Sequence, residues 1–253
     1  MNRPGAYHIV IPARYASERL PGKVLLDLAG KPLLQHVWLR ACESSAQSVV
    51  IATDDERIVV AAEQFGAQVV LTATDHQSGS DRIAECAALL GWPDDHLVVN
   101  LQGDEPLMPA ACLDQVAALL DQRADCEVAS LYWPITAAEE VNNPNAVKVV
   151  TDDQGRALYF SRAPIPFTRD FQSVEEAIAA GLSWKRHLGL YAYRLAALRR
   201  FTACPPTPLE LAERLEQLRI MEQGGQIAMA EACEFIPAGV DTSEDLDRIR
   251  LLI

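Results

Sequence analysis

Three cationic side chains lie close together in a chain that is otherwise acidic. Arg14, Arg19 and Lys23 fall within ten residues, directly after a short apolar run, while the 253-residue chain has a formal net charge of -13. Guanidinium and ammonium groups on one loop can neutralise several phosphate oxygens at once, so this spacing suits a triphosphate. For such a loop taken alone, a solvated basic turn is the alternative.

Two acidic positions further along the chain favour the triphosphate. Asp104 follows the apolar run of residues 97–101, with Gly103 before it to allow close backbone approach, and Asp241 lies in a second short acidic segment. Carboxylates at such positions are natural Mg²⁺ ligands. The alternatives are an acidic turn ended by Pro106 and a helix cap at Asp241. If the two carboxylates meet across the sheet, they would hold one or two magnesium ions against a triphosphate.

Composition excludes several other classes of protein. A pI near 4.8 argues against non-specific nucleic-acid binding. No apolar run approaches the roughly 18 residues of a membrane span. Residues 1–6 lack the features of a secretory signal, and the six cysteines form no C-x-x-C pair, so we expect a cytoplasmic protein with reduced thiols. Its five dispersed histidines disfavour a soft-metal site.

Several common catalytic motifs are also missing from the sequence. It contains no G-x-x-x-x-G-K-[ST], no G-x-G-x-x-G after a strand and no G-x-S-x-G. These absences point to metal-assisted phosphoryl chemistry without a covalent intermediate. No residue stands out as a general base.

The first half of the chain alternates between strand-like and helix-like segments. This order predicts βαβ units and a mostly parallel sheet, on which ligands bind beyond the carboxyl ends of the strands. The predicted strands are residues 7–11, 48–53, 68–71 and 97–101, and the predicted helices are 33–44, 56–65, 81–90 and 109–122.

The second half has a different pattern. A hairpin is predicted from residues 146–151 and 156–160 around a turn that contains Gly155, followed by an extended arm to about residue 171. Further on we predict strands at 188–193 and 227–232, one long helix at 208–222, and a last helix capped within 241–244 and ending at 252. The chain is therefore interpreted as a single domain, 1–253, with an inserted hairpin subdomain at about 133–185.

Eight motifs in register carry a family resemblance that spans residues 9–252. They are PARYASERLPGK, HQSGSDRIAE, NLQGDEP, NPNAVKVV, ALYFSRAPIP, RHLGLYAYR, LEQLR and GVDTSEDL. Together they closely resemble the 3-deoxy-manno-octulosonate (Kdo) cytidylyltransferase family, the CMP-Kdo synthetases of lipopolysaccharide synthesis. The resemblance implies an α/β, Rossmann-like nucleotidyltransferase fold, Mg²⁺ dependence, CTP and Kdo as substrates, and a homodimer built largely from the hairpin region.

The resemblance also implies roles for individual residues. The triphosphate loop corresponds to Arg14, Ser17, Arg19 and Lys23. Positions near the cytosine and ribose correspond to Ala52, Thr53, Asp54, Ser78 and Gly79. Gln102 and Asp104 match the substrate and magnesium positions, and Asp241 matches the second metal carboxylate. Residues around the sugar acid correspond to Arg162, His187, Tyr191, Glu216 and Gln217.

Structural explanations compete with some of these roles. His187 and Tyr191 could be inward-packed polar residues, and Glu216 and Gln217 could lie on a solvated helix face. Arg82 could meet a phosphate or the sugar carboxylate, or pair with Asp81. The family often has Thr-Glu where this chain has Ser-Asp at positions 80 and 81, which puts contacts at those two positions in doubt.

The expected reaction is attack of the anomeric 2-hydroxyl of Kdo on the α-phosphorus of CTP, with loss of pyrophosphate. Arg14, Lys23, Asp104 and Asp241 are the residues predicted to carry it. One alternative is a cytidylyltransferase for another acid sugar, such as 8-amino-Kdo or sialic acid. The other is a catalytically silent nucleotide-binding module that regulates a partner.

Overall fold

The computed structural model describes residues 5–16 and 20–253, and its framework is a nine-stranded sheet. The main path runs β11-β7-β10-β6-β1-β4-β5; β8 branches from β10, and β9 pairs with β8. The strands are β1 (Tyr7–Ala13), β4 (Ser48–Thr53), β5 (Gln68–Leu71), β6 (Leu97–Asn100), β7 (Val128–Ile135), β8 (Lys148–Thr151), β9 (Ala157–Ser161), β10 (Trp184–Arg194) and β11 (Ile227–Glu231). Two short strands, β2 (Asp27–Leu28) and β3 (Lys31–Pro32), form a separate ribbon.

The pairing of the strands confirms the predicted α/β fold with a mostly parallel central sheet. β6, β1, β4 and β5 pair in parallel, and β11 runs parallel to β7. β10 is antiparallel to both β6 and β7. All residues of β1 and β6 are buried, as expected for strands covered by helices on both faces.

Helices cover the two faces of the sheet. One core contains side chains of α1 (Leu33–Cys42), α2 (Glu56–Gln64), α4 (Ala110–Asp121) and α10 (Ser243–Arg250). The other contains side chains of α3 (Gly79–Leu89), α7 (Leu195–Ala203) and α9 (Gln217–Glu222). No helix of the described residues is long and apolar enough to span a membrane.

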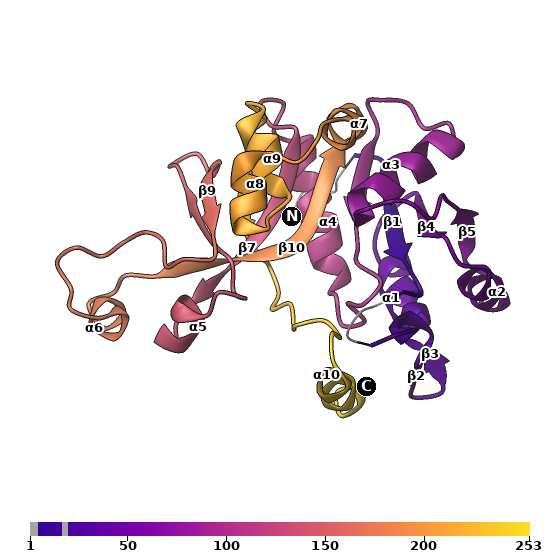
Figure 1. Ribbon diagram of the computed structural model, residues 1–253, viewed down its shortest axis with the longest axis horizontal. Coiled ribbons are helices and arrows are strands. Elements are labelled where there is room, and N and C mark those ends of the chain that lie inside the picture. Colours follow the sequence, from indigo (N-terminus) through magenta and orange to yellow (C-terminus); the bar gives the residue numbers. More distant parts are fainter. Residues whose placement is uncertain (1–4, 17–19) are drawn as a thin grey trace.

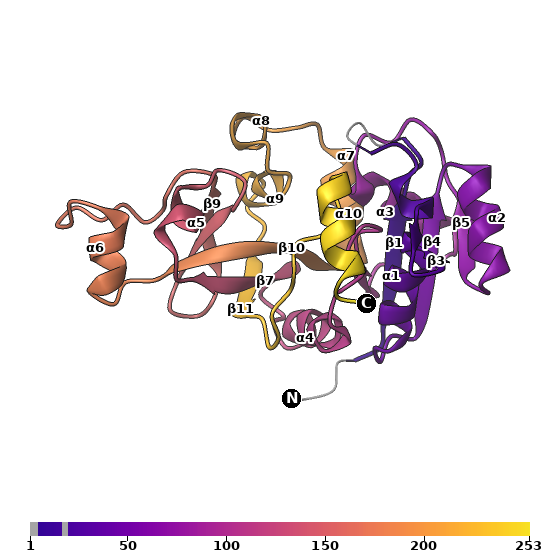
Figure 2. The same cartoon turned by 90° about the horizontal axis from the view of Figure 1, so that it is seen from below.

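The segment between β7 and β10 projects from the sheet as an arm, at the left of Figure 1 and of Figure 2. It contains α5 (Ala138–Asn142), the antiparallel pair β8 and β9, and α6 (Val174–Ala179). The arm has a small core of its own, formed by Ile135, Val141, Ala177 and Trp184. The expected limits of the inserted subdomain, near 133 and 185, fall at the end of β7 and the start of β10.

The prediction of one helix over residues 208–222 is wrong. α8 (Pro208–Glu213) ends at Arg214, which has the left-handed backbone angles φ 54° and ψ 48°, and α9 starts at Gln217. Arg214 is one of two described non-glycine residues with positive φ. A turn therefore lies where the sequence predicts a continuous helix, and Glu216 occupies that turn rather than a helix face.

Candidate active site

A cavity of about 820 Å³ opens beyond the carboxyl ends of β1 and β6. The ends of parallel strands are where an α/β sheet binds its ligands. Eight predicted site residues line this cavity: Arg14, Lys23, Ser78, Gly79, Arg82, Gln102, Asp104 and Asp241. Ser17 and Arg19 lie outside the described residues.

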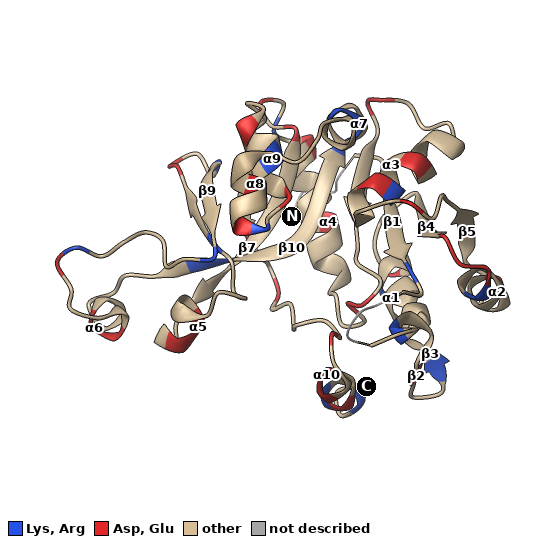
Figure 3. Ribbon diagram, viewed as in Figure 1, with Lys and Arg blue, Asp and Glu red and all other residues tan. Residues whose placement is uncertain are grey.

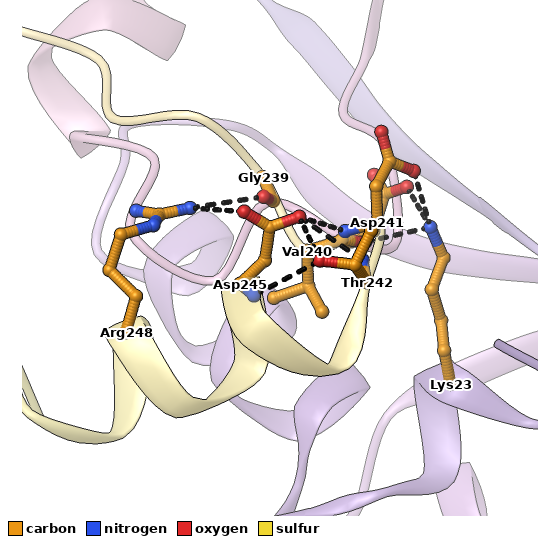
Figure 4. Close-up of polar contacts among 8 residues, drawn as sticks. Lys23, Gly239, Val240, Asp241, Thr242, Asp245 and Arg248 are labelled. Carbon is orange, nitrogen blue, oxygen red and sulfur yellow. Dashed lines mark hydrogen bonds and ion pairs between the residues drawn. The ribbon is translucent and has the colours of Figure 1, made fainter. Parts of the chain in front are cut away.

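At the centre of the cavity wall, Lys23 joins the two predicted metal carboxylates (Figure 4). Its Nζ lies 2.6 Å from Asp104 Oδ2 and 3.2 Å from Asp241 Oδ1. The same ammonium donates to the Val240 carbonyl oxygen at 2.8 Å. Residues separated by more than 200 positions in the sequence thus meet in one cluster, as expected from the sequence.

A close backbone contact brings Asp241 to Asp104. The Val240 N–H donates to the Asp104 carbonyl at 2.8 Å. A Cβ on Gly239 would lie 2.9 Å from that same carbonyl oxygen, closer than real Cβ atoms approach, so only glycine fits here without displacement. The two aspartates are therefore held together by packing of the main chain as well as by Lys23.

The N-terminus of α10 fixes the backbone of Asp241. Thr242 is the helix cap, and its side chain accepts a hydrogen bond from the Asp245 N–H at 3.2 Å. The Asp245 carboxylate accepts hydrogen bonds from the Asp241 and Thr242 N–H groups at 3.1 Å and is paired with Arg248 (Figure 4). Asp241 is thus not the capping residue of the helix, and its carboxylate is directed toward Lys23.

The turn before Lys23 is held against an aromatic ring. Gly22 has a φ of 68°, and its N–H donates to the Tyr15 carbonyl at 2.9 Å. A Cβ on Gly22 would lie 3.0 Å from the Tyr15 ring, and the Arg57 guanidinium stacks on that ring at 3.4 Å from its centroid. The left-handed φ and the close ring both require glycine. They set where the Lys23 side chain leaves the backbone.

The donor set around Lys23 Nζ fits a hard divalent cation. The three partners of this ammonium are all oxygens, two from carboxylates and one from a carbonyl. These oxygens therefore already surround one positive charge, that of Lys23. Mg²⁺ is typically bound by one or two carboxylates together with substrate phosphates and water. Within the described residues, no group of three or more His, Cys, Asp or Glu side chains could hold a metal. Phosphates or water would therefore complete the coordination.

The residues predicted near the nucleoside divide into two groups. Ala52 and Thr53 are fully buried at the end of β4 and do not line the cavity. Ser78 and Gly79 line the cavity, where Ser78 caps α3 and Gly79 packs closely on Pro12. Asp81 completes the capping box with Ser78, which gives this carboxylate a structural role.

Arg82 pairs with Asp54, not with Asp81. The guanidinium donates to Asp54 Oδ2 at 2.7 Å, to the Thr72 hydroxyl and to the Ala73 carbonyl, and Arg82 is 3 % exposed. A nearly buried charge needs such partners. The bonds link the ends of β4 and β5 to α3 beside the cavity.

His76 is a cavity residue to which the sequence analysis gave no role. It lines the cavity, and its Nε2 pairs with the carboxylate of Glu85, which also accepts the Ala73 N–H at 2.9 Å. Both residues belong to the HQSGSDRIAE motif. Their positions, nine residues apart within this motif, were the signal that could have identified the pair.

The predicted sugar-side residues gather on β10 and the turn before α9. The His187 and Tyr191 rings lie 5.3 Å apart, and Ser130 contacts His187 Nε2 at 3.2 Å. Burial lowers the pKa of His187 to about 3 and raises that of Tyr191 well above its usual value, so both are neutral at pH 7. These residues do not line the large cavity; His187 instead lines a smaller one of about 340 Å³.

Glu216 links the predicted sugar-side residues to Ser80 of α3, next to the predicted nucleoside residues Ser78 and Gly79. Its carboxylate accepts a hydrogen bond from Ser80 at 3.4 Å, and burial raises its pKa. Gln217 is 6 % exposed, and its Nε2 has no hydrogen-bond partner among the described residues. Taken as a whole residue, Glu216 is exposed, as the solvated alternative expects, whereas the burial of Gln217 rules out a solvated helix face for that residue. A buried amide nitrogen without a partner is able to donate to a ligand.

Arg162 holds main-chain carbonyls. Its guanidinium donates to the carbonyls of Glu213 at 2.7 Å, Pro144 at 2.9 Å and Arg214 at 3.3 Å. Lys148, which is fully buried, adds a bond to the Arg162 carbonyl at 2.6 Å and another to the Asn143 carbonyl at 3.0 Å. These contacts fasten the arm to the turn that carries Glu216. Here the guanidinium bonds to backbone carbonyls, whereas the family resemblance implies a place beside the sugar acid.

Comparison with known proteins identifies the family. The family model described as "Cytidylyltransferase" matches residues 8–229. The 3-deoxy-manno-octulosonate cytidylyltransferases of Cellvibrio japonicus and Pseudomonas fluorescens are 50 % and 52 % identical, over 98 % of this chain and 98 % of each relative. This chain belongs to the 3-deoxy-manno-octulosonate cytidylyltransferase family. The resemblance found in the sequence is thereby confirmed, and the chain is assigned to the nucleotidyltransferases.

Solved structures agree with this assignment. A structure described as CMP:2-keto-3-deoxy-manno-octonic acid synthetase complexed with CTP is 40 % identical, with a TM-score of 0.89 over 98 % of both chains. A cytidylyltransferase from Leptospira borgpetersenii has a TM-score of 0.62 at 18 % identity, over 97 % of this chain and 86 % of its own, and supports the fold alone. The Kdo cytidylyltransferase fold therefore extends over almost the whole chain.

Proposed function

We propose that this chain transfers CMP from CTP to the anomeric 2-hydroxyl of Kdo, forming CMP-Kdo and pyrophosphate. The observation that carries the proposal is the convergence of Lys23, Asp104 and Asp241 on one wall of a cavity of about 820 Å³. The family relatives, and a 40 % identical structure described as complexed with CTP, support the choice of substrates.

In the proposed reaction, a sugar oxygen replaces pyrophosphate on the α-phosphorus. The 2-hydroxyl oxygen forms the new P–O bond, the bond from the α-phosphorus to the bridging oxygen breaks, and the hydroxyl proton passes to solvent. Phosphoryl transfer of this kind depends mainly on positioning and on neutralising charge. Arg14 and Lys23, which both line the cavity, are proposed to hold the β- and γ-phosphates. Arg19 is proposed to join them.

Asp104 and Asp241 are the proposed Mg²⁺ ligands. When bound, Mg²⁺ supplies charge neutralisation for the triphosphate. Gln102, whose amide donates to Asn100 Oδ1 at 3.0 Å, lies on the same wall and is proposed to contact both substrates. Arg82 and Asp54 are proposed to shape the base pocket through their ion pair.

The acid sugar is proposed to bind between the cavity and β10. His187 and Tyr191 would face its hydroxyls as neutral groups, because burial keeps both uncharged at pH 7. Glu216 and the Gln217 amide would complete the site. Arg162 would act by holding the turn before α9, through its bonds to the Glu213 and Arg214 carbonyls.

We also propose a cytoplasmic homodimer that supplies CMP-Kdo to lipopolysaccharide synthesis. The cysteines of the described residues are free thiols, as expected in a reducing compartment. The arm exposes large apolar side chains, with Phe167 86 % and Leu158 58 % exposed, and a second copy could cover them. Figure 3 shows acidic α5 and α6 beside a basic start of β10, and within the arm Arg186 pairs with Glu140 at 2.8 Å.

Pyrophosphate release tests the proposal. Purified protein with CTP and Mg²⁺ should release pyrophosphate in step with CMP-Kdo when Kdo is added, and should release none with CTP alone. Parallel reactions with 8-amino-Kdo and N-acetylneuraminate test the sugar. A higher kcat/KM for one of these acids would reassign the substrate, and CTP binding without turnover on any of them would indicate a silent nucleotide-binding module.

A further inference from the structure

The ammonium of Lys23 uses all three of its donors on the two aspartates and the Val240 carbonyl. Its three donors reach Asp104 Oδ2, Asp241 Oδ1 and the Val240 carbonyl at 2.6, 3.2 and 2.8 Å. Only 12 % of the side chain is exposed. A lysine in this position occupies the oxygen-lined place that a divalent cation would need.

The aspartates are fixed, whereas the lysine side chain is the movable partner. Backbone contacts join the two acidic segments, since the Val240 N–H reaches the Asp104 carbonyl at 2.8 Å. The Asp245 carboxylate also holds the Asp241 N–H at 3.1 Å. By contrast, the lysine ammonium lies at the end of a flexible four-carbon chain, so it can change hydrogen-bond partners without movement of the backbone.

A divalent cation and the Lys23 ammonium cannot share these oxygens. Two positive groups within a few ångströms repel each other strongly, and each would take ligands from the other. The phosphates of a nucleoside triphosphate offer the ammonium another set of strong acceptors on the same cavity wall. Binding of the triphosphate therefore favours movement of the Lys23 ammonium away from the two aspartates. Once the ammonium has moved, the aspartate oxygens are available to bind the cation.

We infer that Lys23 is an exchangeable stand-in for the divalent cation, so that the cation binds well only after a triphosphate has drawn the ammonium away. The inference rests on the proposed function, because it assigns the cation to Asp104 and Asp241. It adds an order of binding: nucleotide first, cation second. Linkage requires the reverse effect as well, so the cation should raise affinity for the triphosphate.

Binding of Mn²⁺ without nucleotide is the direct test. Free Mn²⁺ is followed by its electron paramagnetic resonance signal during titration of the wild type, Lys23→Met and the control Lys31→Met, which changes an exposed lysine on β3. We expect Lys23→Met to bind Mn²⁺ about tenfold more tightly than the wild type. Lys31→Met should match the wild type. Equal affinity of Lys23→Met and the wild type would overturn the inference.

Two further variants identify the site and the role of charge. The double variant Lys23→Met with Asp104→Asn should lose the gain in affinity, and retention of the gain would place the Mn²⁺ elsewhere and refute the inference. Lys23→Arg keeps the positive charge and should bind Mn²⁺ as weakly as the wild type. If it binds as tightly as Lys23→Met, charge competition is refuted. Lys23→Gln replaces Lys23→Met if the circular dichroism spectrum of the latter departs from the wild type.

The titration is independent of turnover. It contains neither Kdo nor CTP, so a wild type that fails to make CMP-Kdo would sink the proposed function and leave the Mn²⁺ result standing. Conversely, an active enzyme whose Lys23→Met variant gains no Mn²⁺ affinity would refute the exchange of Lys23 with the cation and leave the proposed function standing. Addition of CTP to the wild type should raise its Mn²⁺ affinity beyond the sum of separate binding to protein and to CTP, whereas CMP should not, and an equal effect of CMP would contradict the role of the β- and γ-phosphates.

Discussion

Adding one methyl group at Gly239 should disturb the active site without touching a polar side chain. The new Cβ of Gly239→Ala would lie 2.9 Å from the Asp104 carbonyl oxygen, whereas ordinary contact begins at 3.4 Å. The segments that carry Asp104 and Asp241 must therefore separate by about 0.5 Å, the difference between the two distances. The 2.8 Å bond from the Val240 N–H to the same carbonyl lengthens with them.

This displacement predicts a loss of folding stability and a loss of catalytic rate. Overpacking at one site costs about 1–2 kcal/mol of the free energy of unfolding. A misplacement of about 1 Å can cost a hundredfold in rate, so a shift of half that size predicts about a tenfold fall in kcat. The fall should appear at saturating CTP and Kdo, because the shift moves an aspartate proposed to act in the reaction.

The assay is pyrophosphate release at saturating substrates and Mg²⁺, together with thermal melting. Gly189→Ala is the matched control for stability, since a Cβ there meets nothing within 4 Å and the φ of Gly189 lies outside the left-handed region; it lines the smaller cavity with His187, so its turnover is not used as a control. It should stay within about 0.5 kcal/mol of the wild type in stability. A Gly239→Ala enzyme with wild-type kcat and melting temperature would refute the view that this backbone contact positions Asp241.

Three further predictions concern other groups. Asp241→Asn should lower kcat at least about a hundredfold, with exposed Asp247→Asn as a control that keeps wild-type turnover. Lys148→Met removes the ammonium that donates to the Arg162 and Asn143 carbonyls, so it should lower the melting temperature and raise the KM for Kdo more than that for CTP, and equal KM changes would contradict its link to the turn before α9. Burial and the His96 charge lower the pKa of His8, so stability should fall as pH drops below about 6.5, by up to about 1.4 kcal/mol per unit. Urea unfolding of the wild type and His8→Asn from pH 7.5 to 5 checks this, and equal slopes would count against it.

Strands and helices with a strong local pattern were predictable from the sequence. β4 and β5 have the predicted bounds, Ser48–Thr53 and Gln68–Leu71, because apolar β-branched runs between turn residues leave little ambiguity. β7 and α7 were not predicted. The break at Arg214 was also missed, since Leu and Glu continue at helical spacing through it. Arg162 bonds to the Glu213 and Arg214 carbonyls there, and a contact between segments so far apart is invisible to local propensity.

The candidate site shows the same division. The meeting of Lys23, Asp104 and Asp241 could be expected because their motifs follow strands or precede a helix on one edge of the sheet. The pairing of Arg82 with Asp54 could not, because the local alternative, Asp81, is adjacent in sequence and is occupied by the Ser78 cap. Which of two carboxylates an arginine selects depends on the three-dimensional positions of both.

β10 is a single strand from Trp184, in the small core of the arm, to Arg194, which pairs with Leu97 of β6, although its register with β7 shifts between Leu188 and Tyr191. His187 and Tyr191 lie along it, between the two cores. A deletion that removes the arm to obtain a minimal enzyme would therefore cut the backbone that presents these side chains. Any protein engineer wishing to shorten this chain must keep the whole strand and find another way to cover its outer end.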